Sequence, residues 1–235
     1  MKYRRVPLAA ILTLGVGIGS SACGSSTPPS GPATPPSGPA SPAPPPPPPS
    51  GQIADLQAAA DIIEYNQNAI GGASYRTLGV IARWELPARI FVAPPVSRAL
   101  VAAAMDHWRE AAGIEYTILD EDVEPRILVR AGEDGLGSAT ARGLMDGTYP
   151  NNRGRSGLIV LHPSVADCAT VNCSRIYRHE LGHALGFFGH GSPASLMGGG
   201  ALSATPREAA MMRTLYSLPF GVSVSSDGSY RLVLQ

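Results

Sequence analysis

The chain has 235 residues, a formal net charge of zero and 44% hydrophobic residues. This length accommodates one domain or at most two, and a neutral chain gives no electrostatic reason to expect a nucleic-acid partner. Thirteen of its 23 prolines lie in residues 24–51, and the nine that remain for residues 52–235 are an ordinary globular content. That part carries 15 arginines against 18 acidic residues. The composition therefore predicts a mildly acidic globular domain behind a proline-rich segment.

Residues 1–23 have the pattern of an export signal. Three positive charges in Met1–Arg5 precede an apolar run, Val6–Gly19, that is too short to span a bilayer. Small residues then lead to Cys23, an ending that resembles a bacterial lipoprotein signal, although Ser20 stands where such signals usually have Leu. We expect an exported protein held at the cell envelope by a lipid on Cys23, or a secreted one if cleavage occurs without lipidation.

Residues 24–51 contain only Pro, Ser, Gly, Ala and Thr. Such a segment cannot bury a core, and in the polyproline II conformation it rises about 3.1 Å per residue, which amounts to roughly 80 Å in total. We interpret it as a disordered linker, and residues 52–235 as the folded domain.

Helices and strands both follow in the domain, which predicts an α+β fold. We expect a weak amphipathic helix over Gln52–Ala69, strands over Leu78–Trp84 and Arg89–Val92, a helix over Ser97–Ala112, and strands over Ile114–Leu119 and Arg126–Arg130. A polar, Gly-rich stretch with a short edge strand follows, and then a strand over Gly157–Leu161, helices over Ser174–Leu185 and Thr205–Ser217, and a hairpin of Val222–Ser225 and Tyr230–Leu234.

Three of the five histidines lie within twelve residues, at His179, His183 and His190. Residues four apart on a helix point the same way, so the first two can bind one Zn²⁺. Glu180 lies beside this face and can take a proton from a water molecule on the metal, whose pKa zinc lowers to about 7. Gly186 allows the helix to end and the chain to turn back, so that His190 becomes a third ligand. Three protein ligands with one open position are typical of catalytic zinc.

This segment resembles the metzincin zinc peptidases, in particular their matrixin-like branch. Their motif, HExxHxxGxxH, matches His179, Glu180, His183 and Gly186, and Ser195-Leu196-Met197 resembles their methionine-containing turn (Met-turn). Leu202–Pro206 with Leu215-Tyr216 resembles the lead-in to their C-terminal helix and that helix itself. The resemblance implies a zincin domain with a twisted mixed sheet, an active-site helix, and Met197 as an apolar floor beneath the zinc.

The implied activity is that of a zinc endopeptidase acting on protein or peptide substrates. A substrate strand would pair with a sheet edge, which we expect within Gly137–Leu144. The family's inhibitory pro-segment cysteine is missing, because no cysteine lies between Cys23 and Cys168.

The chain departs from the family motif at the third histidine. The family places it three residues after the glycine, where this chain has Gly189, and His190 comes one residue later. We expect His190 to take the role, because the spacing of 18 residues from His179 to Met197 is that of matrixins.

Several alternatives remain beside this interpretation. A non-catalytic zinc-binding surface lipoprotein would have the same histidines, and so would a structural surface protein in which they occur by chance. A thermolysin-like scheme would use Glu208 as third ligand. Acidic and Asn residues of Glu133–Asn152 are candidate Ca²⁺ ligands, although no loop there has EF-hand spacing.

Four further residues receive structural interpretations, and we expect a monomer. Outside the cytoplasm, Cys168 and Cys173 form a disulfide more readily than they act as zinc-binding or inhibitory thiols. His107 and His162 are expected to serve the fold rather than the metal.

Overall fold

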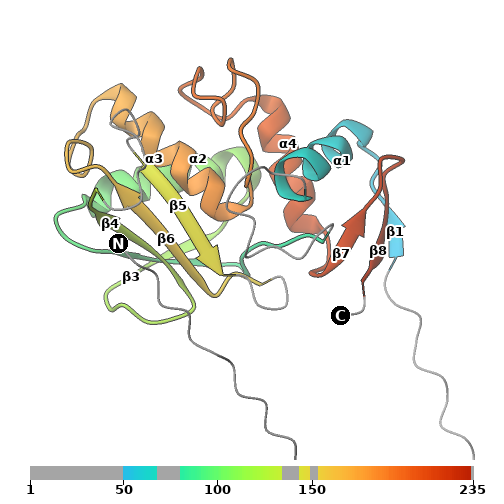
Figure 1. Cartoon of the computed structure of the whole chain (residues 1–235), viewed down its shortest axis with the longest axis horizontal. Coiled ribbons are helices and arrows are strands. Elements are labelled where there is room, and N and C mark those ends of the chain that lie inside the picture. Colours follow the sequence, from blue (N-terminus) through green and yellow to red (C-terminus); the bar gives the residue numbers. More distant parts are fainter. Residues whose placement is uncertain (1–49, 68–79, 134–142, 149–152, 234–235) are drawn as a thin grey trace, which may run out of the picture. The chain divides into compact units, whose positions relative to one another are not determined.

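The computed structural model describes residues 50–67, 80–133, 143–148 and 153–233. The signal, Cys23 and nearly all of the predicted linker therefore lie outside the described residues. Helices combine with a mostly parallel sheet and a separate antiparallel sheet, which agrees with the predicted α+β class (Figure 1). Among the described residues, no helix has both the length and the apolar character needed to cross a membrane.

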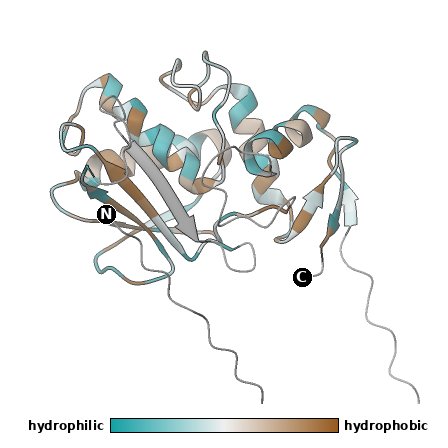
Figure 2. Cartoon of the chain, in the orientation of Figure 1, coloured by the Kyte–Doolittle hydropathy of each residue, from teal (hydrophilic) through white to brown (hydrophobic). Residues whose placement is uncertain are grey.

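The larger sheet has five strands. Their order is β3 (Tyr116–Leu119), β2 (Ala88–Val92), β4 (Arg126–Ala131), β6 (Ser156–Leu161) and β5 (Gly143–Thr148). The first four are parallel, and β5 runs antiparallel to β6 at the sheet's edge. Burial alternates along β2, whereas β6 is buried at four of its six residues and is apolar along most of its length (Figure 2). The sheet therefore supplies one side of the hydrophobic core.

Helices α2 (Arg98–Ala112) and α3 (Val171–Leu185) pack against each other and against this sheet (Figure 1). Ser97 caps the start of α2, and Gly113, at φ 73°, ends it in the left-handed conformation. Trp108 is fully buried between the two helices, and its indole Nε1 donates to the carbonyl oxygen of Arg178 at 2.9 Å. This hydrogen bond joins α2 to the main chain of α3 within the core.

The second sheet is antiparallel, with the order β1 (Ser50–Gln52), β8 (Ser229–Leu232) and β7 (Val222–Val224). Helix α1 (Leu56–Ile62) continues into a π-helical turn, η1 (Ile63–Gln67), and packs against α4 (Pro206–Ser217). An ion pair between the buried Asp61 and the half-exposed Arg207 joins α1 to α4.

One predicted strand is wrong. Residues 80–84 of the expected strand Leu78–Trp84 form only an isolated bridge, between Arg83 and Arg153, and Leu78 lies outside the described part. All five side chains from Val80 to Trp84 are buried, so the alternation of a half-buried strand is lost. Their main-chain groups bond to several elements instead: the Ile81 N–H donates to Val222 and the Ala82 N–H to the side chain of Asn66.

Element boundaries also differ at the start of the domain. Ser50 and Gly51, which composition assigned to the linker, pair with β8. A Cβ on Gly51 would lie 2.4 Å from the Tyr230 hydroxyl oxygen, so a larger residue there would displace the Tyr230 side chain. The first helix begins at Leu56 rather than near Gln52, because the Asp55 side chain caps it.

The remaining predicted elements are present with small shifts. The edge strand is β5 at Gly143–Thr148, and residues 137–142 of the expected substrate edge lie outside the described residues, as does most of the candidate calcium stretch. Helix α3 begins three residues before the expected Ser174, because Thr170 caps it. The C-terminal hairpin forms around Gly228, at φ 81°.

Candidate metal centre

Helix α3 carries the first two histidines of the motif. The disulfide between Cys168 and Cys173, predicted from sequence, joins the preceding loop to the first turn of α3. Gly186 ends the helix with φ 136°, a conformation that L side chains rarely adopt, and the N–H groups of Gly186 and Phe187 return to the carbonyls of His183 and Gly182. The chain then turns back toward the helix.

This turn brings the three histidines together. One ligand nitrogen from each of His179, His183 and His190 lies within 4.8 Å of the others. The His190 ring centroid is 5.3 Å from that of His179 and 4.9 Å from that of His183. The structure thus places His190, and not the residue at position 189, beside the two helical histidines.

Hydrogen bonds orient the two helical imidazoles. Nδ1 of His179 donates to the carbonyl oxygen of Leu196 at 2.9 Å, and Nδ1 of His183 donates to that of Phe187. A carbonyl oxygen can only accept, so both hydrogens lie on Nδ1 and both Nε2 atoms keep their lone pairs. Such a carbonyl partner on the second ring nitrogen is the usual arrangement around metal-binding histidines.

The two Nε2 atoms lie 3.1 Å apart. With both lone pairs free they repel one another and form no hydrogen bond, and a cation between them removes the repulsion. A tetrahedral zinc ion, with Zn–N bonds of about 2.0–2.1 Å, separates two ligand nitrogens by about 3.3 Å. The residues present therefore fit a zinc ion.

Burial keeps the two helical imidazoles neutral. Burial, and after it the neighbouring His179, lowers the pKa of His183 to about 3. The pKa of His179 is also lowered, mainly by burial. Neutral imidazole is the form that binds a metal.

Glu180 is buried beside this cluster and is 7% exposed. Its carboxylate accepts no hydrogen bond from the described residues, and burial raises its pKa to about 8. A cation bound by the neighbouring histidines would favour the carboxylate form by Coulomb attraction.

The Met-turn packs directly beneath α3. A Cβ on Gly182 would lie 2.6 Å from Sδ of Met197 and 2.9 Å from the Trp108 ring, so this helix position must be glycine. Met197 is fully buried and is not part of the histidine cluster, and its role as the floor of a zinc site stays a prediction.

Glu208 does not belong to the metal-ligand group, which corrects the alternative ligand set. Its carboxylate accepts hydrogen bonds from the main-chain N–H groups of Leu196, Met197 and Thr205, and from the Thr205 hydroxyl. It therefore serves two purposes: it caps α4, and it holds the peptide whose Leu196 carbonyl orients His179. The Thr205-x-x-Glu208 spacing is a capping-box pattern that sequence reasoning could have used.

Three other side chains hold the end of α3, and sequence reasoning assigned them no role at the site. The last carbonyls of a helix lack partners within it. Here Trp84 Nε1 donates to Ala184 at 2.7 Å, the Tyr216 hydroxyl to Leu185 at 2.8 Å, and Asn66 Nδ2 to Gly186 at 3.2 Å. No local pattern identifies these partners, because they come from three separate elements.

The segment Gly198–Ala204, after the Met-turn, has small side chains except for Leu202, and side chains of other elements bond to its main chain. Arg175, one turn before His179, donates to the Gly199 carbonyl, and Arg178 donates to that of Leu202 at 2.7 Å. His107 accepts from the Ala204 N–H at 3.0 Å, and His162 bonds to Ser164, so both have the predicted structural roles.

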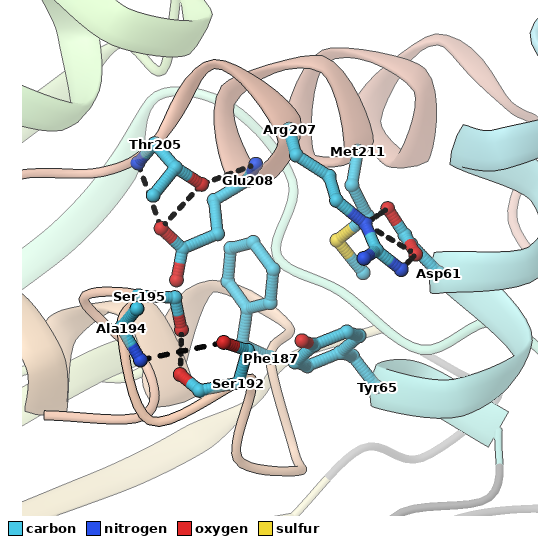
Figure 3. Close-up of a pocket in the computed structure, with 10 residues that line it drawn as sticks. All are labelled: Asp61, Tyr65, Phe187, Ser192, Ala194, Ser195, Thr205, Arg207, Glu208 and Met211. Atoms are coloured by element: carbon cyan, nitrogen blue, oxygen red, sulfur yellow. Dashed lines mark hydrogen bonds and ion pairs between the residues drawn. The ribbon is translucent and has the colours of Figure 1, made fainter. Parts of the chain in front are cut away.

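A pocket of about 230 Å³ is lined by residues of α1, η1, α4 and the loop after α3 (Figure 3). Tyr65, Phe187 and Met211 form its apolar lining, and the Asp61–Arg207 pair lies at one side. None of the three histidines lines it.

No known protein family model matches the chain, and no match to it is found among curated proteins. The site is therefore interpreted from its own residues.

Proposed function

We propose that the protein is a zinc-dependent endopeptidase with a metzincin-like, matrixin-like domain. The observation that carries the proposal is the convergence of three histidine ligand nitrogens within 4.8 Å, two of them fixed by carbonyl acceptors on Nδ1. Three imidazole ligands without a fourth side-chain ligand are typical of catalytic rather than structural zinc.

His179, His183 and His190 would hold the ion. Zinc in such a site supplies Lewis acidity toward a peptide carbonyl and toward water. Glu180, next to the first ligand, accepts a proton from the attacking water and delivers it to the amine that leaves when the C–N bond breaks. Its burial favours this role, because a carboxylate without hydrogen-bond donors remains a stronger base than a solvated one.

The sheet edge formed by β5 supports the choice of substrate. β5 ends the five-stranded sheet and contacts α3, and no described strand pairs with its outer edge. An extended peptide can add to such an edge through main-chain hydrogen bonds. The substrate class that follows is an unfolded protein or a peptide.

Cleavage of casein tests this proposal. Glu180→Ala should lower the cleavage rate by about 10²–10⁴-fold and leave the bound zinc unchanged, because Glu180 is a proton carrier and not a ligand. A zinc chelator should abolish cleavage by the parent protein, and added zinc should restore it. Glu110→Ala, on the exposed side of α2, is the matched control.

Two results would count against it. A Glu180→Ala protein that cleaves like the parent would remove Glu180 from the mechanism. A parent protein that binds zinc but cleaves nothing would support the alternative, a non-catalytic zinc-binding surface protein.

The proposal includes an extracytoplasmic location. The charged start, the short apolar run and Cys23 support export with lipid attachment, and residues 24–49 supply a spacer. The disulfide between Cys168 and Cys173 agrees with an oxidising compartment.

A further inference from the structure

The turn that carries His190 has little means of fixing its own conformation. It contains Gly186, Gly189 and Gly191, and glycine loses more backbone freedom on ordering than any other residue. His190 itself is exposed, so burial does not hold its side chain. The contacts that order this turn must therefore come from elsewhere in the fold.

Many of them come from η1. Asn66 is completely buried, and its Nδ2 donates to the carbonyls of Gly186 at 3.2 Å and Ala82 at 3.0 Å. Its Oδ1 accepts from the Ala82 N–H at 3.4 Å. One amide thus joins the end of α3 to the buried segment before β2.

Tyr65 contacts the same turn at two further points. Its carbonyl accepts from the Gly189 N–H at 3.1 Å, directly before His190. Its ring packs edge-on against Phe187, with centroids 5.6 Å apart. After His190, a Cβ on Gly191 would lie 2.5 Å from Oγ of Ser195 and 2.6 Å from the Tyr65 hydroxyl oxygen, so any larger residue there would displace these side chains.

These contacts account for the shifted ligand. The position where the motif has its third histidine is Gly189, and the main chain of that residue is bonded to η1. With Gly186 and Gly189 both fixed from η1, the next residue, His190, projects toward the two helical histidines.

We propose that η1 fixes the turn that carries His190 and so helps to form the metal centre. Asn66 is the positioning residue that keeps His190 within reach of the ion. This inference rests on the proposed function only through the presence of the ion. The N-terminal end of the domain, directly after the linker, then determines whether the site has two ligands or three.

The fold offers a matched control. Arg207 binds Asp61 and so joins the same N-terminal segment to α4, but it makes no hydrogen bond to the turn from Gly186 to Gly191 among the described contacts (Figure 3). Arg207→Gln should weaken the packing of α1 and leave the position of His190 unchanged. Asn66→Ala should weaken the packing of this N-terminal segment and also displace His190.

The test measures zinc dissociation constants of the full chain, by competition with a chromophoric chelator, together with unfolding by urea. We expect Asn66→Ala to weaken zinc binding about 10- to 100-fold, as outer-sphere substitutions commonly do, and Arg207→Gln to change it less than threefold. His190→Ala should weaken binding strongly in the parent but add little in the Asn66→Ala background, because two changes to one interaction are not additive.

Two further measurements test the inference independently of zinc affinity. The visible spectrum of the Co²⁺-substituted protein should change for Asn66→Ala as it does for His190→Ala, and not for Arg207→Gln. If Asn66→Ala fails to fold, Tyr65→Leu removes the ring contacts with Phe187 and Gly191 and keeps the Tyr65 main-chain carbonyl, and faster hydrogen exchange of the Gly189 amide reports the loosened turn.

Parental zinc affinity for Asn66→Ala and Tyr65→Leu, or full additivity with His190→Ala, would overturn the inference. The proposed function can fail separately. If the parent protein binds zinc but does not cleave casein, the zinc affinities of the variants still test the role of Asn66. A parent that binds no zinc would overturn both.

Discussion

Two buried glutamates near the three histidines show how surroundings determine the role of a carboxylate. Glu180 has no hydrogen-bond donor among the described residues, and burial raises its pKa. Glu208 is equally buried but accepts four hydrogen bonds, three of them from main-chain N–H groups. The first is available to carry a proton, whereas the second is committed to holding the Met-turn and the start of α4.

Glu208→Gln tests this second role. An amide nitrogen in place of one carboxylate oxygen would face N–H donors, so we expect a loss of roughly 1–3 kcal/mol in the free energy of unfolding. Urea denaturation measures it, with the exposed Glu110→Gln as control. An unchanged midpoint would contradict the assignment.

At the level of elements, the end of α3 depends on partners distant in sequence. Ala184, Leu185 and Gly186 expose successive carbonyls, and side chains from residues 80–87, α4 and η1 occupy them. The histidine cluster lies immediately beside this end, so packing of the helix terminus and geometry of the site are coupled.

Tyr216→Phe removes one of these bonds, together with the hydrogen bond between the same hydroxyl and the Trp84 main chain. Removing the hydroxyl leaves the Leu185 carbonyl without that donor, and we expect at least about 1 kcal/mol of lost stability. Tyr65→Phe is the comparison, because the Tyr65 hydroxyl donates no hydrogen bond to the described residues. Thermal unfolding should separate the two variants, and equal midpoints would show that the bond adds nothing.

The predicted strand at Leu78–Trp84 failed for a related reason. Its apolar and β-branched residues indicated an element that would be buried, which is correct for Val80–Trp84. Whether a buried extended segment pairs with one strand or with several elements depends on which neighbours the fold brings to it, and local composition carries no such information.

For the whole molecule, the signal, the spacer and the domain together predict attachment at a surface. If Cys23 carries lipid, a bacterial host fed labelled fatty acid should label the parent protein and retain it in the membrane fraction. Cys23→Ala should lose the label, while the double variant Cys168→Ser with Cys173→Ser should keep it. Label that persists without Cys23 would exclude lipidation at this residue.

The sequence by itself determined most of the order of elements, the disulfide pair and the identities of the candidate metal-ligand residues, because periodicity, capping and the spacing of His179 and His183 are local properties of the chain. It also named His190 in place of Gly189. Only the tertiary structure decided how these residues are held: Leu196 and Phe187 orient the imidazoles, Glu208 holds the Met-turn, and Asn66 joins η1 to the end of α3. Such contacts join residues up to 120 positions apart, and packing alone selects them.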